Sequence, residues 1–295
     1  MRRSRHAAAL GAAQRGEGPL HRKVLVTLRA ACADMSPALS RIGEYVLAQP
    51  DRILVQTVTE LAEQSGSSEA SVIRFCRDFG FFGFQDFKLG IATELASEPP
   101  PSGRRSPESD EIGNIVDGAI AALKDTQQLL EVEAIGTVVD RLLVARRIHL
   151  FGVAASAVTV RYLHYKLVRL GLVAMAHEDP HMASMAATSL TRQDVAVAVS
   201  TTGSTIDTVR AAAVAHKAGA FLVAITNRPK SPLARTADVV LLAASAETPL
   251  TGGALPSRIS QLLVVDVLFE RMAAQDRRAH AFIQTTAASV ADRGY

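Results

Sequence analysis

The alternation of short apolar runs with helical segments in the second half of the chain constrains the fold most. These runs are continuously apolar, which is typical of strands covered on both faces. Because helices separate the runs, the sequence predicts a parallel sheet with helices on both sides. The predicted strands span residues 148–152, 173–176, 195–200, 221–226 and 239–242, and a helix over residues 255–274 closes the set.

The first half of the chain shows helical periodicity instead. Leu39, Ile42 and Val46 follow a 3–4 spacing that places them on one face of a helix over residues 37–47. Other segments with helical character span residues 20–33, 59–64, 68–79, 84–96 and 112–143, the last broken near residues 132–134. The sequence therefore predicts an all-helical N-terminal part joined to an α/β part.

Composition places the boundaries between these parts. Residues 98–111 are rich in proline, serine and charge, so we expect an exposed linker there, and we expect a disordered tail over residues 1–18. This leaves one domain over residues 19–97 and another over residues 112–295. Residues 1–107 carry 14 basic and 11 acidic side chains, while the remainder carries 18 of each. The net positive charge therefore lies wholly in the helical part, as expected of a part that binds nucleic acid.

Residues 61–75 read as a helix, a glycine turn at Gly66 and a second helix that Ser68 can cap. A helix-turn-helix needs a small residue at the turn and polar side chains on the outer face of its second helix. Arginine can contact guanine or phosphate, and serine suits phosphate. The expected DNA contacts are Ser67, Ser68, Glu69, Ser71, Arg74 and Arg77, with Lys88 reaching the DNA backbone from the following helix.

Two hydroxyl-bearing turns follow predicted strands. The first contains Gly152 and Ser156, and the second runs from Ser200 to Thr205. Ligands of open parallel sheets bind at the carboxyl ends of the strands, where helix N-termini offer unpaired N–H groups to a phosphate. The predicted phosphate-binding residues are Ser156, Ser200, Thr201, Thr202, Gly203, Ser204 and Thr205, and Asp179 and His181 are candidates for contacts with sugar hydroxyls. For Ser156 alone, local helix capping is an equally simple interpretation.

Residues 66–77, 79–81 and 83–88 closely resemble the helix-turn-helix domain of the RpiR family of bacterial transcriptional regulators. Residues 113–290 resemble the SIS (sugar isomerase) domain, which in that family senses phosphorylated sugars; Thr202 stands where the family usually has serine, and Ala154 where glycine is common. The resemblance implies an α/β protein overall. It combines an all-α helix-turn-helix domain with an α/β/α SIS domain, whose five-stranded parallel sheet has a flavodoxin-like strand order.

Two functions remain open at this point. The first is a regulator of carbohydrate metabolism that binds an operator in double-stranded DNA and a sugar-phosphate effector, and that assembles as a homodimer or tetramer through the SIS domain. The second is a phosphosugar isomerase or lyase with an accessory helical domain, for which the candidate bases would be His164, Glu178, Asp179, His181 and Glu247. Arg74 and Arg77 on an exposed helix favour the regulator, since an isomerase has no use for them.

Several classes of protein are disfavoured by what the sequence lacks. It contains no Walker loop, Gly-x-Ser-x-Gly elbow, zinc-ligand spacing or dinucleotide fingerprint, so we predict no catalytic residues, no metal and no cofactor. No apolar run approaches the ~18 residues needed to span a bilayer, so no membrane partner is expected. Cys32 and Cys76 are the only cysteines, which favours free thiols and a cytoplasmic location.

Overall fold

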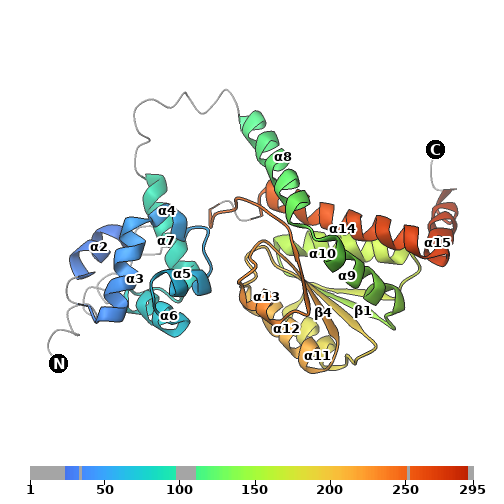
Figure 1. The fold of residues 1–295 in the computed structure, drawn as a ribbon, viewed down its shortest axis with the longest axis horizontal. Coiled ribbons are helices and arrows are strands. Elements are labelled where there is room, and N and C mark those ends of the chain that lie inside the picture. The colour runs from blue at the N-terminus through green and yellow to red at the C-terminus, as the bar shows by residue number, and fades with distance from the viewer. Residues whose placement is uncertain (1–23, 33–34, 98–110, 251–252, 292–295) are drawn as a thin grey trace. The chain divides into compact units, whose positions relative to one another are not determined.

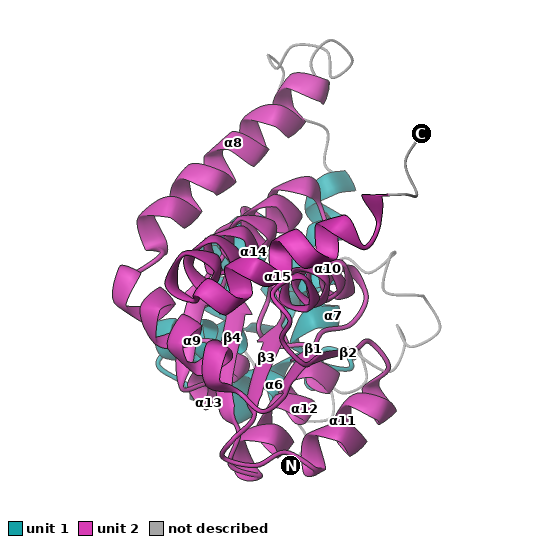
Figure 2. Ribbon diagram, turned by 90° about the vertical axis from the view of Figure 1, so that its right-hand side faces the viewer, with its two compact units in different colours: residues 1–109, 247–252 teal, residues 110–246, 253–295 magenta. Residues whose placement is uncertain are grey.

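The computed structural model describes residues 24–32, 35–97, 111–250 and 253–291. The chain divides into two compact units, each described here by itself (Figure 2). Unit 1 comprises residues 1–109 and 247–252, and unit 2 comprises residues 110–246 and 253–295. The predicted tail over residues 1–18 and the predicted linker, apart from residue 111, lie outside the described residues.

The described residues of unit 1 include six helices (Figure 1). In chain order they are α2 (Val24–Ala31), α3 (Pro37–Ala48), α4 (Pro50–Ile53), α5 (Val58–Gln64), α6 (Glu69–Asp78) and α7 (Phe84–Ser97). Their bounds follow local signals in the sequence: Pro37 and Pro50 stand in the first turns of α3 and α4, where a missing N–H costs nothing. These helices confirm the all-helical N-terminal part.

An aromatic cluster holds unit 1 together. The Phe75 ring of α6 meets the Phe87 ring of α7 edge to face, with centroids 5.6 Å apart, and Phe81 meets Phe87 at 5.3 Å in the same way. Phe75 and Phe87 are fully buried, together with Ile42 of α3 and Leu61 of α5. Edge-to-face aromatic pairs contribute roughly 0.5–1.5 kcal/mol beyond the area they bury. This core fixes α6 against its neighbours and leaves its opposite face to solvent.

Unit 2 is built on a five-stranded parallel sheet (Figure 1). Its strands are β1 (Ile148–Phe151), β2 (Ala174–His177), β3 (Val195–Val199), β4 (Phe221–Thr226) and β5 (Val239–Leu242). Their order is β2-β1-β3-β4-β5, which confirms the predicted flavodoxin-like arrangement. The chain runs outward from β1 to β2 and then returns to place β3 on the other side of β1. The carboxyl ends of β1 and β3 therefore flank the point where the strand order reverses, which is where such sheets bind ligands.

Helices cover both faces of this sheet. The helices of unit 2 are α8 (Glu111–Leu129), α9 (Val132–Val144), α10 (Ala155–Arg169), α11 (Pro180–Thr188), α12 (Ile206–Lys217), α13 (Pro232–Thr236), α14 (Leu255–Gln275) and α15 (Arg277–Ala288). In Figure 1, α9, α10 and α14 lie on one side of the sheet, and α11, α12 and α13 lie on the other. This is the three-layer α/β/α architecture expected from the alternating pattern.

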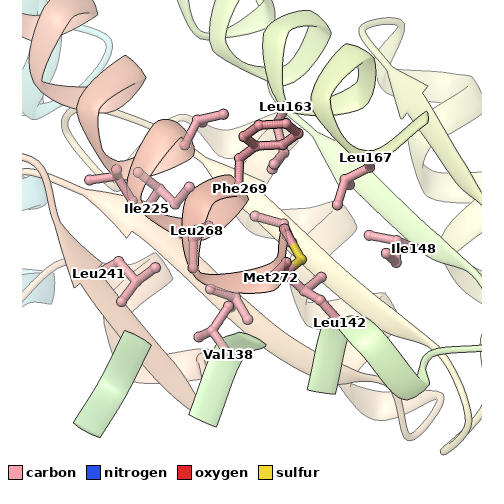
Figure 3. Close-up of a cluster of buried hydrophobic side chains, with 14 of the residues drawn as sticks. Val138, Leu142, Ile148, Leu163, Leu167, Ile225, Leu241, Leu268, Phe269 and Met272 are labelled. Atoms are coloured by element: carbon pink, nitrogen blue, oxygen red, sulfur yellow. The ribbon is translucent and has the colours of Figure 1, made fainter. Parts of the chain in front are cut away.

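The two faces of the sheet differ in the size of their side chains, and β3 shows why. Val195, Val197 and Val199 point into the cluster beneath α9, α10 and α14, shown in Figure 3, which also contains Leu163 and Phe269. The alternate residues of β3, Ala196 and Ala198, point into an alanine-rich cluster beneath α11 and α12. Because successive side chains of a strand point to opposite faces, the Val-Ala alternation gives one thick and one thin hydrophobic layer.

Two predicted boundaries need correction. The break between α8 and α9 falls at residues 130–131, just before the predicted position near residues 132–134. The chain also does not end its regular structure with α14, because α15 follows. Asp276 starts this extra helix, since its side chain accepts a hydrogen bond from the N–H of Arg278.

Candidate functional site

Local hydrogen bonds build the helix-turn-helix of unit 1. Thr57 and Glu60 form a reciprocal capping box at the start of α5. Gly66 turns the chain with a φ of 58°, a conformation that favours glycine. The Arg41 side chain donates to the carbonyl oxygens of Ser65 and Gly66, at 3.2 and 2.9 Å, and so holds the turn from α3. Ser68 caps α6 by accepting from the N–H of Ser71.

The sequence of α6 separates a buried face from an exposed one. Val72, Phe75 and Cys76 are buried, and burial raises the pKa of the Cys76 thiol well above its usual range. Arg74 and Arg77 are exposed. Within α6, Nε of Arg74 lies 3.8 Å from the Asp78 carboxylate, and an exposed ion pair this long contributes little. Both guanidinium groups are thus presented on the outer face of the second helix.

The predicted DNA contacts with short side chains are engaged within unit 1. The Ser67 hydroxyl lies 2.8 Å from that of Ser65, and the Ser68 and Ser71 hydroxyls lie 2.9 Å apart. Glu69 accepts a hydrogen bond from the Thr59 hydroxyl at 2.6 Å. These contacts fix the turn and the start of α6. Among the predicted DNA contacts, Arg74 and Arg77 therefore have the side chains that can extend farthest toward a groove of DNA.

The prediction for Lys88 is wrong. Its side chain is 5% exposed, and its Nζ donates to the carbonyl oxygen of Gln56 at 3.0 Å, inside unit 1. Nζ also lies 5.4 Å from the centroid of the Phe84 ring. Helical periodicity alone could not show this, because a lysine can extend its apolar stem through a core and satisfy its ammonium group on a backbone carbonyl. Lys88 therefore serves the packing of α7 rather than the surface.

The first turn of unit 2 opens the N-terminus of α10. Gly152 sits where a Cβ would lie 2.8 Å from Val160 and 3.2 Å from the carbonyl oxygen of Val199, so only glycine fits. Ala154 then stands at the N-cap position with φ 51° and ψ −126°, and no side chain caps the helix. Ser156 is the second residue of α10, not its cap, and is buried. No side chain accepts from the first turn, while the N–H groups of Ser156 and Ala157 donate to the carbonyl oxygens of Val153 and Ala154, at 3.1 and 3.0 Å.

The second turn opens the N-terminus of α12 in a similar way. Ser200 is 1% exposed, and its hydroxyl accepts from the N–H of Gly203 and lies 3.1 Å from the Thr205 hydroxyl. Thr205 is at the N-cap position of α12 but makes no side-chain cap. Gly203 has a φ of 60°, and a Cβ there would collide with the Ser231 side chain. The N–H of Ser204 donates to the Thr202 hydroxyl, and the Ser204 hydroxyl donates to the Thr202 carbonyl oxygen.

Arg258 joins the two turns. Its Nη1 donates to the carbonyl oxygen of Ala155 at 2.8 Å, and its Nη2 donates to the Thr201 hydroxyl at 2.8 Å. Gln261, one turn further along α14, also donates to the Thr201 hydroxyl at 3.0 Å. The structure thus brings Ser156 and residues 200–205 to one edge of the sheet, beside a guanidinium group. Arg258 and Gln261 were not among the predicted site residues, since only the fold places α14 beside these turns.

Asp179 and His181 are in other positions. Asp179 caps α11 by accepting from the N–H of Met182 at 2.8 Å, and His181 is exposed in the first turn of that helix. Both residues follow β2, which is an edge strand of the sheet, whereas the two hydroxyl-bearing turns follow β1 and β3. The hydrogen bonds described above that join those two turns do not include Asp179 or His181.

A pair of histidines lies beneath the first turn and was missed by the sequence analysis. The rings of His149 on β1 and His177 on β2 stack with centroids 5.0 Å apart, and Nε2 of His177 lies 3.1 Å from Nδ1 of His149. Burial, and then the neighbouring His177, lower the pKa of His149 to about 4; burial also lowers the pKa of His177. Both rings are therefore uncharged near neutral pH, and they add no positive charge to the sheet edge.

Comparisons with known proteins agree with this arrangement. The description "Helix-turn-helix domain, rpiR family" matches residues 22–98, and "SIS domain" matches residues 141–271. An uncharacterized HTH-type transcriptional regulator of Caldanaerobacter subterraneus is 34% identical over 250 residues, which cover 83% of this chain and 89% of the relative. The chain belongs to the RpiR family of transcriptional regulators.

Two solved structures of similar proteins support the same assignment. The Vibrio vulnificus NanR protein, complexed with ManNAc-6P, has a TM-score of 0.85 and 34% identity, covering 92% of this chain and 100% of that one. The sugar isomerase domain of an RpiR transcription factor from Sphaerobacter thermophilus has a TM-score of 0.56 and 27% identity, covering 60% of this chain and 98% of that one. The resemblance to the RpiR family and to the SIS domain is thereby confirmed.

Ala154 stands where glycine is common in SIS domains of this family, and its backbone conformation is one that destabilises the folded protein when the residue carries a Cβ. Its φ of 51° is strained for any residue with a Cβ. Replacing Ala154 with Gly should raise the free energy of unfolding of unit 2 by about 1 kcal/mol, or roughly 2–4 °C in melting temperature. Ala155→Gly is the matched control: Ala155 is the first residue of α10 and glycine relieves no strain there, so this change should lower stability slightly, by less than the roughly 0.5–1 kcal/mol of a mid-helix position. Thermal unfolding of both variants should show shifts of opposite sign; equal losses would contradict the assigned strain.

Proposed function

We propose that this RpiR-family protein binds an operator through α6 of unit 1, and a phosphorylated sugar or sugar acid at the turns after β1 and β3. Ligand binding would shift its affinity for the operator. Residues 19–97 would form the DNA-binding domain, and residues 112–295 the sensor. A regulator of this kind acts in the cytoplasm, where its operator lies, and as a homodimer or tetramer it can present two recognition helices to two half-sites. In the described part of the chain, no helix has the length and apolar content to cross a bilayer.

The observation that supports the sensor role is the position of two uncapped helix N-termini of unit 2. Asp179 caps α11, and Ser231 caps α13, each with its side chain. Helices α9, α10, α12 and α14 begin without a side-chain cap, and of these four α10 and α12 start at the two turns that flank the reversal of strand order. Helix N-termini attract phosphate through unpaired N–H groups and a partial positive charge. Arg258 adds a formal positive charge between them.

The sugar class is inferred from a relative. The NanR structure, 34% identical to this chain, is described as a complex with ManNAc-6P, a phosphorylated amino sugar. Sequence similarity across 92% of this chain supports a phosphorylated sugar as the effector here as well. We therefore propose that the phosphate occupies the open helix N-termini, with the Ser156, Thr202, Ser204 and Thr205 side chains beside it.

The chain would bind this ligand without converting it. Of the candidate bases, His164 lies 3.1 Å from the carbonyl oxygen of Ala174, Glu178 pairs with Arg161 at 3.1 Å, and Asp179 is engaged as a helix cap. A phosphosugar isomerase remains the second candidate function.

A thermal-shift panel tests the proposal. Purified full-length protein is melted with a set of sugar phosphates and phosphorylated sugar acids, each beside its unphosphorylated parent. At a hundred times its Kd, a ligand should stabilise the protein by about 2.7 kcal/mol, whereas its parent should leave the melting temperature unchanged. The active ligand should also change operator affinity, and NMR of the same sample should show it intact after incubation. A parent that shifts the protein equally would contradict the phosphate assignment, and turnover would favour the isomerase.

A further inference from the structure

Helix α8 carries an apolar seam that its own unit does not cover. Val116, Ile120, Leu123, Gln127 and Leu130 follow one another at intervals of 4, 3, 4 and 3 residues, with Leu130 just past the end of the helix. This spacing places all five on one face. Ile112 stands one turn before the seam and is 80% exposed, while Val116 and Ile120 are 47% and 43% exposed. Apolar exposure repeated along one helix face marks a contact surface.

The seam is distinct from the face with which α8 packs in its own unit. Ala119, Ala122 and Thr126 are buried, and α8 makes its most extensive packing with α14. In Figures 1 and 2, the N-terminal turns of α8 project beyond the other elements of unit 2. The helix therefore has two apolar faces, of which one is used against α14 and the other faces outward in its N-terminal half.

The C-terminal half of the same seam forms a wall of a groove. Leu123 lines it from α8, Leu130 from the turn that follows, Ile135 from α9, and Leu263 and Val267 from α14, with Lys124 and Gln127 of α8 completing the lining. These side chains leave a concave and mainly apolar surface. Helix α8 thus carries a projecting apolar ridge at its N-terminal end and lines an apolar groove at its C-terminal end. A two-fold symmetric interface requires such a self-complementary surface, because each copy presents the same ridge and the same groove.

We propose that α8 pairs antiparallel with α8 of a second copy of this chain, about a two-fold axis between residues 121 and 122. In this register, Ile120 lies against Leu123 of the second copy and Val116 lies against Gln127. Each projecting ridge then fills the groove of the other copy. Because the axis exchanges the two contacts, each pair occurs twice and the interface closes on itself.

Charge on the flank of the seam favours the antiparallel direction. Asp117 and Lys124 are exposed, seven residues apart, and therefore lie on the same side of the seam. Antiparallel helices set equivalent flanks against each other, so that Asp117 of one copy meets Lys124 of the other, twice per dimer. Parallel helices would set this flank against the opposite one and lose both pairs. The seam and its flank thus agree on one arrangement.

The first test measures self-association of the full-length chain by sedimentation equilibrium. The wild type should be a dimer or a higher even assembly, and Val116→Glu should weaken self-association by at least a hundredfold, because it buries a carboxylate in an apolar groove. Val144→Glu makes the same chemical change at the far end of α9, where valine is 79% exposed, and should leave self-association unchanged. A monomeric wild type, or a Val116→Glu variant that associates as tightly as the control, would overturn the proposal.

Charge exchange tests direction and register. Lys124→Glu alone should weaken the dimer, whereas Asp117→Lys combined with Lys124→Glu should restore it. No such rescue is expected from an effect within one helix, because residues seven apart, about 10 Å along the axis, do not touch. A carbodiimide should also join Asp117 to Lys124 between copies in a mixture of ¹⁴N- and ¹⁵N-labelled chains. A joined peptide of one label only, a link from this flank to unit 1, or no rescue would each exclude the antiparallel pair.

This pairing goes beyond the proposed function and can fail separately from it. A chain that binds a sugar phosphate and an operator, but whose association ignores Val116 and Lys124, would contradict the α8 interface alone. A chain that dimerises through α8 without responding to any sugar phosphate would contradict the sensor role alone.

Discussion

Replacing Arg74 with Ala should weaken specific operator binding by about 5- to 150-fold. Arg74 lies on the exposed face of α6, and its ion pair with Asp78 is long and exposed, so its guanidinium can turn to a base edge at little cost. A two-point contact between arginine and guanine is worth about 1–3 kcal/mol. The operator is first selected from random duplexes, and the affinities are then measured by fluorescence anisotropy. Binding to unrelated DNA should fall much less, because it depends on total charge.

Arg52→Ala provides the control for Arg74. Arg52 is also exposed and also lies in unit 1, but on α4, outside the helix-turn-helix. Both variants lose one positive charge, so a general electrostatic effect would be similar in the two. Only Arg74→Ala should reduce the discrimination between operator and unrelated DNA. If Arg74→Ala binds the operator as tightly as the wild type does, α6 is not the recognition helix.

The double change Ser200→Ala and Thr205→Val should weaken sugar-phosphate binding by about 100-fold or more while leaving operator binding intact. Their hydroxyls lie 3.1 Å apart, and Ser200 also holds the N–H of Gly203, so together they set the shape of the turn and the open N-terminus of α12. Hydrogen bonds to a charged group are worth about 1.5–3 kcal/mol each. Valine keeps the branched shape of threonine, so the change chiefly removes polar atoms. Isothermal titration with the effector found by thermal shift measures the loss.

A second double variant separates this effect from a general loss of stability. Thr188 and Ser189 at the end of α11 are exposed, and their hydroxyls donate to backbone carbonyls of the same helix. Thr188→Val with Ser189→Ala therefore removes the same two hydroxyl types away from the turns after β1 and β3. This control should keep full effector affinity. Equal affinity losses in the two double variants would remove the turn after β3 from the ligand site.

The features predicted correctly from the sequence are those that one local rule determines. The parallel sheet and the three layers follow from short apolar runs separated by helices, because a parallel strand requires a crossover and a covering layer, whereas the strand order was implied by the family resemblance. Gly66 and Ser68 mark the turn of the helix-turn-helix for equally local reasons, one conformational and one a cap. The extra helix α15 was not predicted, because a single N-cap residue, Asp276, is the sequence feature that separates it from the long helix α14 before it.

Side-chain roles were harder to predict because they depend on what lies across a packed interface. Lys88 was expected to reach the DNA backbone, yet its ammonium group donates to the carbonyl oxygen of Gln56, 32 residues earlier in the chain. Arg258 carried no role in the sequence, yet it links the turn after β1 to the turn after β3 across separations of 103 and 57 residues. No local pattern encodes contacts of this range.

By itself, the sequence determined the two-part architecture, the helix-turn-helix and the parallel sheet, since these rest on periodicity, capping and turn chemistry that act within a few residues; the family came from the resemblance of its motifs. Only the tertiary structure decided which helix N-termini stay open, which hydroxyls hold a turn and which cation joins the turns. Those properties arise when strands reverse their order and bring the ends of β1, β3 and α14 to one edge. In the sequence the residues of these turns and of α14 are far apart, and they form one candidate site only after the sheet and its helices have packed.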